Sequence, residues 1–302
     1  MILTVTLNPA VDKTCRLQEL ILGQVNRLYS TQSIAGGKGV NVTKILRQFG
    51  YPVTAMGFLG GYSGRMIEDT LQKMGAVCRF TPILQETRVS TNVIADNGYV
   101  TEILEPGPVI SKQELEAFLA DYQGAIKECE LVVLSGSIPQ GVDADIYETL
   151  IELAKKEGCK VLLDSSQEAL RKGVEAAPYL IKPNQKELEY LVGRKIKSRE
   201  ELIEEANKLL QKGIQKVLIS LGAKGLLYVD KEGWLLQPAY SVDVLNTVAC
   251  GDTVVASYCM SELEQKERES ALKCATALSA ANATTEESAQ IPMEVYQKLV
   301  EE

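Results

Sequence analysis

Short apolar runs that alternate with helix-like segments constrain the fold of this 302-residue chain more than any other feature. The runs are rich in Val, Ile and Leu, as are strands that are buried on both faces of a parallel sheet. The segments between them place apolar residues at helical spacing. The pattern predicts strands at 2–7, 53–59, 131–137, 160–166, 179–184 and 216–222 and helices at 40–49 and 64–74. We therefore expect an α/β protein whose ligands bind beyond the carboxyl ends of the strands.

Two regions, 14–34 and 87–104, break this alternation. The second carries Asn97-Gly98 between β-rich runs, which is a strong hairpin signal because type I′ turns need positive φ at both central positions. We expect the two regions to form a small antiparallel sheet that covers a site at the edge of the main sheet. The chain has no internal repeat and no low-complexity linker, so residues 1–302 are predicted to form one domain with this lid.

Composition narrows the possible partners. A net charge of -8 argues against a nucleic-acid surface, which needs clustered Lys and Arg. The N-terminus has no basic leader, and no apolar run approaches the ~20 residues that span a bilayer, so no membrane association is expected. The seven cysteines are scattered without a CxxC pair, which is typical of reduced thiols in a cytoplasmic protein.

The complete absence of histidine limits the chemistry further. It excludes Ser-His-Asp and Cys-His catalysis, and it makes a zinc site unexpected in a chain without paired cysteines. A general base must then be Asp, Glu, Lys, Tyr or Cys. Asp252, in the stretch LNTVACGDTVVASY, is one candidate. We expect Asp252 to be both the N-cap of a helix, which is a common role for Asp, and this base. The alternative is that Asp252 is only the cap.

Four glycine-rich or polar loops follow the predicted strands: AGGKGVNV (35–42), KPNQKEL (182–188), SLGAKG (220–225) and VACGDT (248–253). Backbone N–H groups in such loops can cradle phosphate, and Lys38 adds positive charge at a helix start. Each loop also has a purely structural interpretation. The first and third can be simple turns, and Asn184 with Glu187 can be a capping box rather than a polar pair near a metal ion.

Taken in order, the motifs TLNPAVD, GGKGVNV, ETR, LSGSIP, KPNQKEL, SLGAKG and ACGDT resemble those of the ribokinase-like (PfkB) family of sugar kinases, across essentially the whole chain. The resemblance implies a ribokinase-like three-layer α/β sandwich that uses ATP and Mg²⁺. TLNPAVD, ETR and TEILEPGP are most similar to the branch that phosphorylates ketohexose monophosphates. Tagatose 6-phosphate is the favoured substrate, and fructose 1-phosphate is the alternative.

The resemblance also assigns roles to residues. Asp252 matches the catalytic base, and the anion-hole positions are Ala249, Cys250 and Gly251. Arg88 matches the ligand of the substrate's own phosphate, and the other sugar-binding positions are Asp12, Gly37, Lys38 and Asn41. Glu187 is expected near magnesium, through water. The ATP-binding positions are Lys182, Asn184, Ser220, Gly222, Lys224, Gly225 and, near adenine, Asn282.

One departure from the family pattern concerns the anion hole. Related kinases read Gly-Ala-Gly-Asp or Gly-Ser-Gly-Asp, whereas this chain reads Ala249-Cys250-Gly251-Asp252. If the first position needs positive φ, Ala costs roughly 1 kcal/mol or more there. The change motivates a second hypothesis, in which a degenerate kinase fold senses sugar phosphate and nucleotide. The family resemblance also implies a homodimer that forms through the lid.

Overall fold

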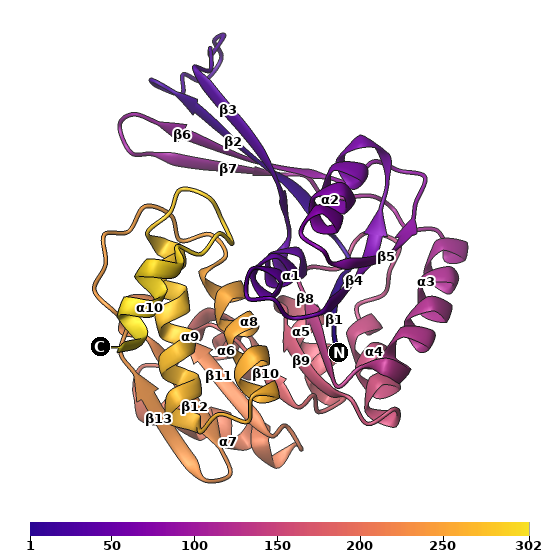
Figure 1. Ribbon diagram of the computed structural model, residues 1–302, viewed down its shortest axis with the longest axis vertical. Coiled ribbons are helices and arrows are strands. Elements are labelled where there is room, and N and C mark those ends of the chain that lie inside the picture. Colours follow the sequence, from indigo (N-terminus) through magenta and orange to yellow (C-terminus); the bar gives the residue numbers. More distant parts are fainter. Residues whose placement is uncertain (302) are drawn as a thin grey trace.

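A nine-stranded sheet forms the middle layer of the protein, which is described for residues 1–301 by a computed structural model (Figure 1). The strand order is β13-β12-β11-β10-β9-β8-β1-β4-β5, in which β12 runs antiparallel to both of its neighbours and the others run parallel. The bounds are β1 Ile2–Thr6, β4 Val53–Leu59, β5 Val77–Pro82, β8 Leu131–Ser135, β9 Lys160–Asp164, β10 Leu180–Ile181, β11 Lys216–Ser220, β12 Leu226–Asp230 and β13 Gly233–Gln237.

Helices cover both faces of this sheet because successive strand residues point to opposite sides. Ile2 packs toward one helix layer, whereas Leu3 and Val5 pack toward the other. The first layer holds α1 Lys38–Gln48, α2 Gly61–Lys73, α8 Cys250–Leu263, α9 Arg268–Ala283 and α10 Met293–Glu301. The second holds α3 Lys112–Ala125, α4 Ile146–Lys156, α5 Gln167–Glu175, α6 Gln185–Val192 and α7 Arg199–Gln211. Two 3₁₀ turns are η1 Ile126–Glu128 and η2 Gly222–Lys224. The predicted three-layer sandwich is confirmed.

A second sheet of four strands, the lid, projects from one end of the sandwich (Figure 1). Its order is β3-β2-β6-β7, with bounds β2 Ala10–Leu17, β3 Ser30–Gly36, β6 Val89–Ala95 and β7 Val100–Leu104. Each half is an antiparallel hairpin, as expected. The two hairpins meet in a parallel pairing of β2 with β6, so the lid as a whole is mixed.

Most predicted elements are found, with shifted ends. The strand expected at 179–184 contributes only Leu180–Ile181 to the sheet, and α2 begins at Gly61 rather than at residue 64. The hairpin at Asn97-Gly98 is present, but the predicted type I′ turn is wrong. Of Asn97 and Gly98, only Gly98 has positive φ (87°). The N–H of Gly98 donates to Ala95 O at 2.9 Å, so a type I turn followed by one left-handed residue joins the strands.

Within residues 1–301, no helix has the length and apolar character needed to cross a membrane. All seven cysteine thiols are free.

Candidate active site

Unsatisfied polar atoms gather at the carboxyl ends of the parallel strands. The described residues contain five buried side-chain oxygens without a hydrogen-bond partner, and four of them lie at or beside this edge of the sheet. These four are Asn8 Oδ1, Asn41 Oδ1, Ser135 Oγ and Asp164 Oδ2. Buried polar groups in native proteins almost always have partners. This edge of the sheet is therefore built to receive a polar ligand.

Three charged side chains, each buried or half-buried, interact at this edge: Asp164, Lys38 and Lys182. Asp164, at the end of β9, accepts from Lys38 Nζ at 3.0 Å and lies 3.3 Å from Lys182 Nζ. Burial alone would raise the pKa of Asp164, but the two ammonium groups outweigh it and lower that pKa. Burial likewise opposes the charge of Lys38, whose pKa is nevertheless raised by Asp164, Asp252 and Glu187. The contact between Asp164 and Lys38 thus favours the charged form of both groups.

Asp252 lies in the first turn of α8 and is 5% exposed. Its Oδ2 accepts a hydrogen bond from Asn41 Nδ2 at 2.8 Å. Burial raises the pKa of Asp252 to about 6, although the ammonium of Lys38 opposes the shift. The expectation that Asp252 caps the helix is wrong. Ala249 is the N-cap, and the Asp252 carboxylate turns toward α1 instead of toward the backbone of its own helix.

The start of α8 has the geometry of an anion cradle. Ala249 has φ 67°, so the strain anticipated at this position is present. No described residue accepts a hydrogen bond from the backbone N–H of Ala249, Gly251 or Asp252. A side chain at Gly251 would lie 3.3 Å from Lys182 Nζ, so the cradle also faces a buried ammonium group. Free N–H groups and a nearby positive charge favour an anionic ligand here.

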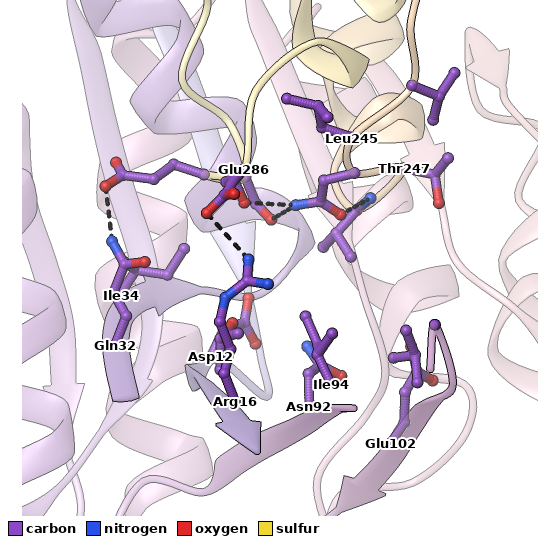
Figure 2. A pocket seen from close by; sticks show the side chains of 18 residues that line it. Asp12, Arg16, Gln32, Ile34, Asn92, Ile94, Glu102, Leu245, Thr247 and Glu286 are labelled. Atoms are coloured by element: carbon purple, nitrogen blue, oxygen red, sulfur yellow. Dashed lines mark hydrogen bonds and ion pairs between the residues drawn. The ribbon is translucent and has the colours of Figure 1, made fainter. Parts of the chain in front are cut away.

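A cavity of about 610 Å³, the lid cavity, lies between the inner face of the lid and the loops before α8 and after α9 (Figure 2). Figure 2 shows Arg16 and Gln32 of the lid reaching toward the second loop, where Arg16 Nη2 lies 3.0 Å from Glu286 Oε2 and Gln32 Nε2 lies 2.7 Å from Glu287 Oε1. Asp12 lines the same cavity. Burial raises its pKa to about 6, against the opposing charges of Lys44 and Arg88.

A second cavity of about 690 Å³, the α8–α9 cavity, lies on the other side of the cradle. Val244 and Thr247 line both cavities, so the two adjoin at the segment that leads into α8. Of the residues predicted to bind ATP or form the anion hole, the α8–α9 cavity brings together Asn184, Ser220, Gly222, Gly225, Cys250 and Gly251.

Arg88, just before β6, carries a guanidinium whose hydrogen bonds within the described residues go to backbone carbonyl oxygens. It donates to the carbonyl oxygens of Asn8 and Glu105 at 3.2–3.3 Å and forms no ion pair with any residue in 1–301. Burial lowers the pKa of Arg88, and the negative charges of Asp12 and Glu105 offset part of this decrease. A partly buried positive charge with only carbonyl partners is suited to a phosphate oxygen. Gly37, with φ 100°, is the N-cap of α1 and leads directly into Lys38 and Asn41.

Three residues predicted to bind ATP, Lys182, Lys224 and Asn282, do not line the α8–α9 cavity. Lys182 lies beneath the cradle against Asp164 rather than along the α8–α9 cavity, and Lys224 is exposed outside it. Asn282 is 0% exposed, so the expected approach to adenine is wrong. Glu187 and Asn184 do form a capping box: Glu187 Oε2 accepts from Asn184 N at 2.8 Å, and Asn184 Oδ1 accepts from Glu187 N at 2.9 Å.

Sequence reasoning missed Asp164, Asn8 and Arg16 as site residues. The first two follow or end buried strands, a position at which polar side chains meet across a parallel sheet. That signal was available in the sequence. Arg16 gave no such signal, because only the pairing of β2 with β6 reveals which of its faces lines the cavity.

Comparisons with known proteins decide the family. Residues 5–295 match the model of the pfkB family of carbohydrate kinases. This chain belongs to that family. It is 36% identical over 279 residues to a 1-phosphofructokinase of Vibrio cholerae (92% of this chain, 88% of the relative). It is 35% identical over 302 residues to a tagatose-6-phosphate kinase of Staphylococcus epidermidis (99% of this chain, 97% of the relative).

Solved structures agree on the fold of this pfkB kinase. Phosphofructokinase-2 from Escherichia coli in complex with fructose-6-phosphate superposes with a TM-score of 0.91 at 25% identity, covering 99% of this chain and 98% of that one. Ribokinase from Arabidopsis thaliana, complexed with ribose and ATP, gives a TM-score of 0.81 at 21% identity (99% of this chain, 98% of that one), which supports the fold alone.

The raised pKa of Asp252 predicts that Asp252→Asn stabilises the protein. Between pH 4 and 6 the folded state binds the proton more tightly than the unfolded state, whose carboxyl has a pKa near 3.8, so stability falls as pH rises. Above pH 6 the charged carboxylate lowers the free energy of unfolding by about 1–3 kcal/mol. We expect Asp252→Asn to regain it at pH 7.5, to keep about half of that gain near pH 5 and to lose it near pH 4, as measured by urea unfolding.

Asp164→Asn is the matched control, because the pKa of Asp164 is lowered and its charge neutralises two ammonium groups. This variant should be less stable than wild type at pH 7.5. Equal stability changes of the same sign in the two variants would contradict the charge assignment.

Proposed function

We propose that this kinase transfers a phosphoryl group from ATP to a ketohexose monophosphate and forms the bisphosphate, with tagatose 6-phosphate as the favoured substrate and fructose 1-phosphate as the alternative. Both relatives named above are kinases of such sugar phosphates. Each candidate carries phosphate at one terminal carbon and a free primary hydroxyl at the other. The observation that carries the proposal is the buried Asp252 carboxylate beside the free N–H groups of the cradle, where the two cavities adjoin.

The α8–α9 cavity fits a nucleotide. Its volume is in the range of small-molecule sites, and the turn from Ser220 to Gly225 offers backbone groups along one side. The bound ATP would present its terminal phosphate to the cradle, with Mg²⁺ neutralising part of the charge. Residues 1–301 hold no cluster of three or more His, Cys, Asp or Glu side chains that could bind a metal. That fits Mg²⁺, which keeps several waters and takes phosphate oxygens as ligands.

Glu187 and Asp164 are the residues that fit such a magnesium ion. The capping box uses one oxygen of Glu187, Oε2, and this fixes the side chain while Oε1 can reach a metal-bound water. Asp164 Oδ2 is buried without a partner. Lys38 and Lys182 hold the other oxygen of Asp164 in place.

Asp252 is the group on this chain that can take the proton from the acceptor hydroxyl. A carboxylate with a pKa near 6 is ionised at neutral pH and is a stronger base than an ordinary aspartate. The amide of Asn41 orients one carboxylate oxygen and leaves the other free. Meanwhile the N–H groups of Ala249 and Gly251, together with Lys182, stabilise the negative charge of the group in transfer.

Sugar recognition falls to the lid and to α1. Asp12 and the unpartnered Asn41 Oδ1 can accept hydrogen bonds from sugar hydroxyls. Arg88 can bind the substrate's phosphate through a charge-assisted hydrogen bond. Together these groups would distinguish a phosphorylated ketose from a free sugar.

The sensor hypothesis is disfavoured by the same geometry. Although Ala and Cys replace the usual cradle residues, Ala249 still adopts the left-handed conformation. The cradle N–H groups remain free, and Asp252 remains buried with a raised pKa. A protein that only bound its ligands would have no need to retain these costly features.

We also propose that the lid mediates a homodimer. Its outer strands β3 and β7 have unpaired edges, and several large apolar residues on it are exposed, among them Leu22 (89%), Val25 (84%), Tyr99 (75%) and Ile103 (56%). Exposed edges and apolar side chains favour pairing with a second copy.

The proposed function determines which sugars are phosphorylated and how the rate depends on pH. In a coupled ADP-release assay, tagatose 6-phosphate or fructose 1-phosphate should be phosphorylated, whereas the free sugars should not. Because Asp252 must be ionised to accept the proton, kcat/KM should fall below pH 6, by about tenfold per pH unit. The absence of turnover with both phosphosugars would exclude the proposal.

Two variants identify the group that titrates. Asp252→Asn should lose on the order of 10²–10⁴-fold in kcat and retain ATP binding. Asp12→Asn should keep the acid limb near pH 6, although Asp12 itself has a pKa of about 6. If the limb disappeared in Asp12→Asn and persisted in Asp252→Asn, the roles would be reversed.

Arg88→Ala should raise KM for the phosphosugar about 10- to 100-fold and leave KM for ATP nearly unchanged, because a charge-assisted contact contributes about 1.5–3 kcal/mol. Steady-state kinetics at saturating co-substrate measure both constants. Arg79→Ala is the control, since Arg79 pairs with Asp121 outside both cavities. An equal rise of both KM values in Arg88→Ala would refute the assignment.

For the dimer, light scattering at micromolar concentration should give twice the mass of one chain. Ile103→Asp, on the face of β7 opposite to that lined by Val100 and Glu102, should shift the protein to monomer. Leu84→Asp, at a residue 97% exposed but outside the lid, should remain dimeric. A monomeric wild type would rule the proposal out.

A further inference from the structure

Asn282, near the end of α9, is fully buried behind the start of α8. Its Nδ2 donates to Val248 O at 2.9 Å and to Cys250 Sγ at 3.5 Å. Its Oδ1 accepts from Ala289 N at 2.9 Å. The amide is thus engaged at both ends by protein groups, and it is not available to a ligand.

The contact with Val248 O bears directly on the cradle. The carbonyl of Val248 and the N–H of Ala249 belong to one planar, trans peptide unit, so they point in opposite directions. When Asn282 holds the carbonyl toward α9, the Ala249 N–H is directed away from α9. Among residues 1–301, Asn282 is the one that donates a hydrogen bond to Val248 O.

The adjacent backbone makes such a restraint necessary. Ala249 is left-handed, with φ 67°, a conformation that an L-residue with a Cβ adopts at a cost. Without a partner for Val248 O, this peptide unit could rotate and relieve the strain. The N–H would then leave the cradle.

We propose that Asn282 is a positioning residue for phosphoryl transfer: it holds the Val248–Ala249 peptide so that the Ala249 N–H faces the group in transfer. The inference rests on the proposed kinase function of the cradle. Asn282 was expected to lie near adenine; the role proposed here is instead to fix the backbone of the anion hole through Val248 O. Asn282 itself touches neither the sugar nor the nucleotide.

Asn282→Leu tests the proposal, because Leu has a similar volume and no hydrogen-bonding group. Displacing one cradle donor should lower kcat by about 10- to 100-fold. This loss in kcat should not exceed the loss that follows complete removal of such a donor. KM for ATP and for the phosphosugar should change less than about threefold. ADP with aluminium fluoride, a mimic of the phosphoryl group in transfer, should bind more weakly to the variant by a similar factor in calorimetry, whereas ADP alone should bind equally.

Gln48→Leu is the matched control. Gln48 also holds the loop after α9 through both ends of its amide, donating to Ala289 O at 2.6 Å and accepting from Ile291 N at 2.9 Å, but its side chain is exposed and does not contact the cradle. This variant should lose stability and keep kcat. Equal losses of kcat in the two variants, or a normal kcat and normal aluminium fluoride binding in Asn282→Leu, would overturn the proposal.

Two further outcomes are distinguishable. If Asn282→Leu does not fold, Asn282→Gln retains the amide and displaces it by one methylene, and it should show the same pattern of kcat loss at constant KM. A normal kcat there would also refute the inference. If the wild type turns over neither phosphosugar, the proposed substrates are wrong, while binding of ADP with aluminium fluoride still decides whether Asn282 positions the cradle.

Discussion

The contacts of Asp164 with Lys38 and Lys182 fix the charge of the whole site, and the remaining features depend on them. Two ammonium groups without this carboxylate would repel each other in a buried place, and burial alone would raise the pKa of the carboxylate. Held together, they keep positive charge beneath the cradle and beside Asp252. The parallel sheet makes this possible because β9 and β10 end side by side, so that residues distant in sequence meet there.

Two features of the site oppose stability. Asp252 carries a buried charge, and Ala249 adopts a strained backbone conformation. Neither would persist unless the surroundings determined it, and here the surroundings are the packed layer formed by α1, α8 and α9. The apolar contacts of that layer, which contain Val254, Val255 and Cys259 of α8, offset the cost of a site prepared before any ligand arrives.

The sequence was sufficient where a local pattern sets the structure and insufficient where distant segments meet. Apolar periodicity predicted the parallel strands and the two helix layers, and Asn97-Gly98 predicted the lid hairpin. The motif around Asp252 identified the cradle and the departure at Ala249. The carboxylate of Asp252 was nevertheless expected to cap α8, because its true partner, Asn41, lies in another helix. Asn282 was misplaced for the same reason, since burial on the inner side of α9 depends on packing that no local pattern encodes.

The parallel pairing at the centre of the lid has a consequence for how the chain acquires its structure. Strand β2 pairs with β6, and a complete unit of α1, β4, α2 and β5 lies between them in sequence. The loop closed by that pairing is long, so its entropic cost must be met before the lid gains any contact energy. We expect the hairpin of β2 and β3 to be only marginally stable until the first half of the sandwich has folded. The lid is then the last part of this half to form and the first to open under denaturant, and its amides should exchange with solvent faster than those of the central sheet.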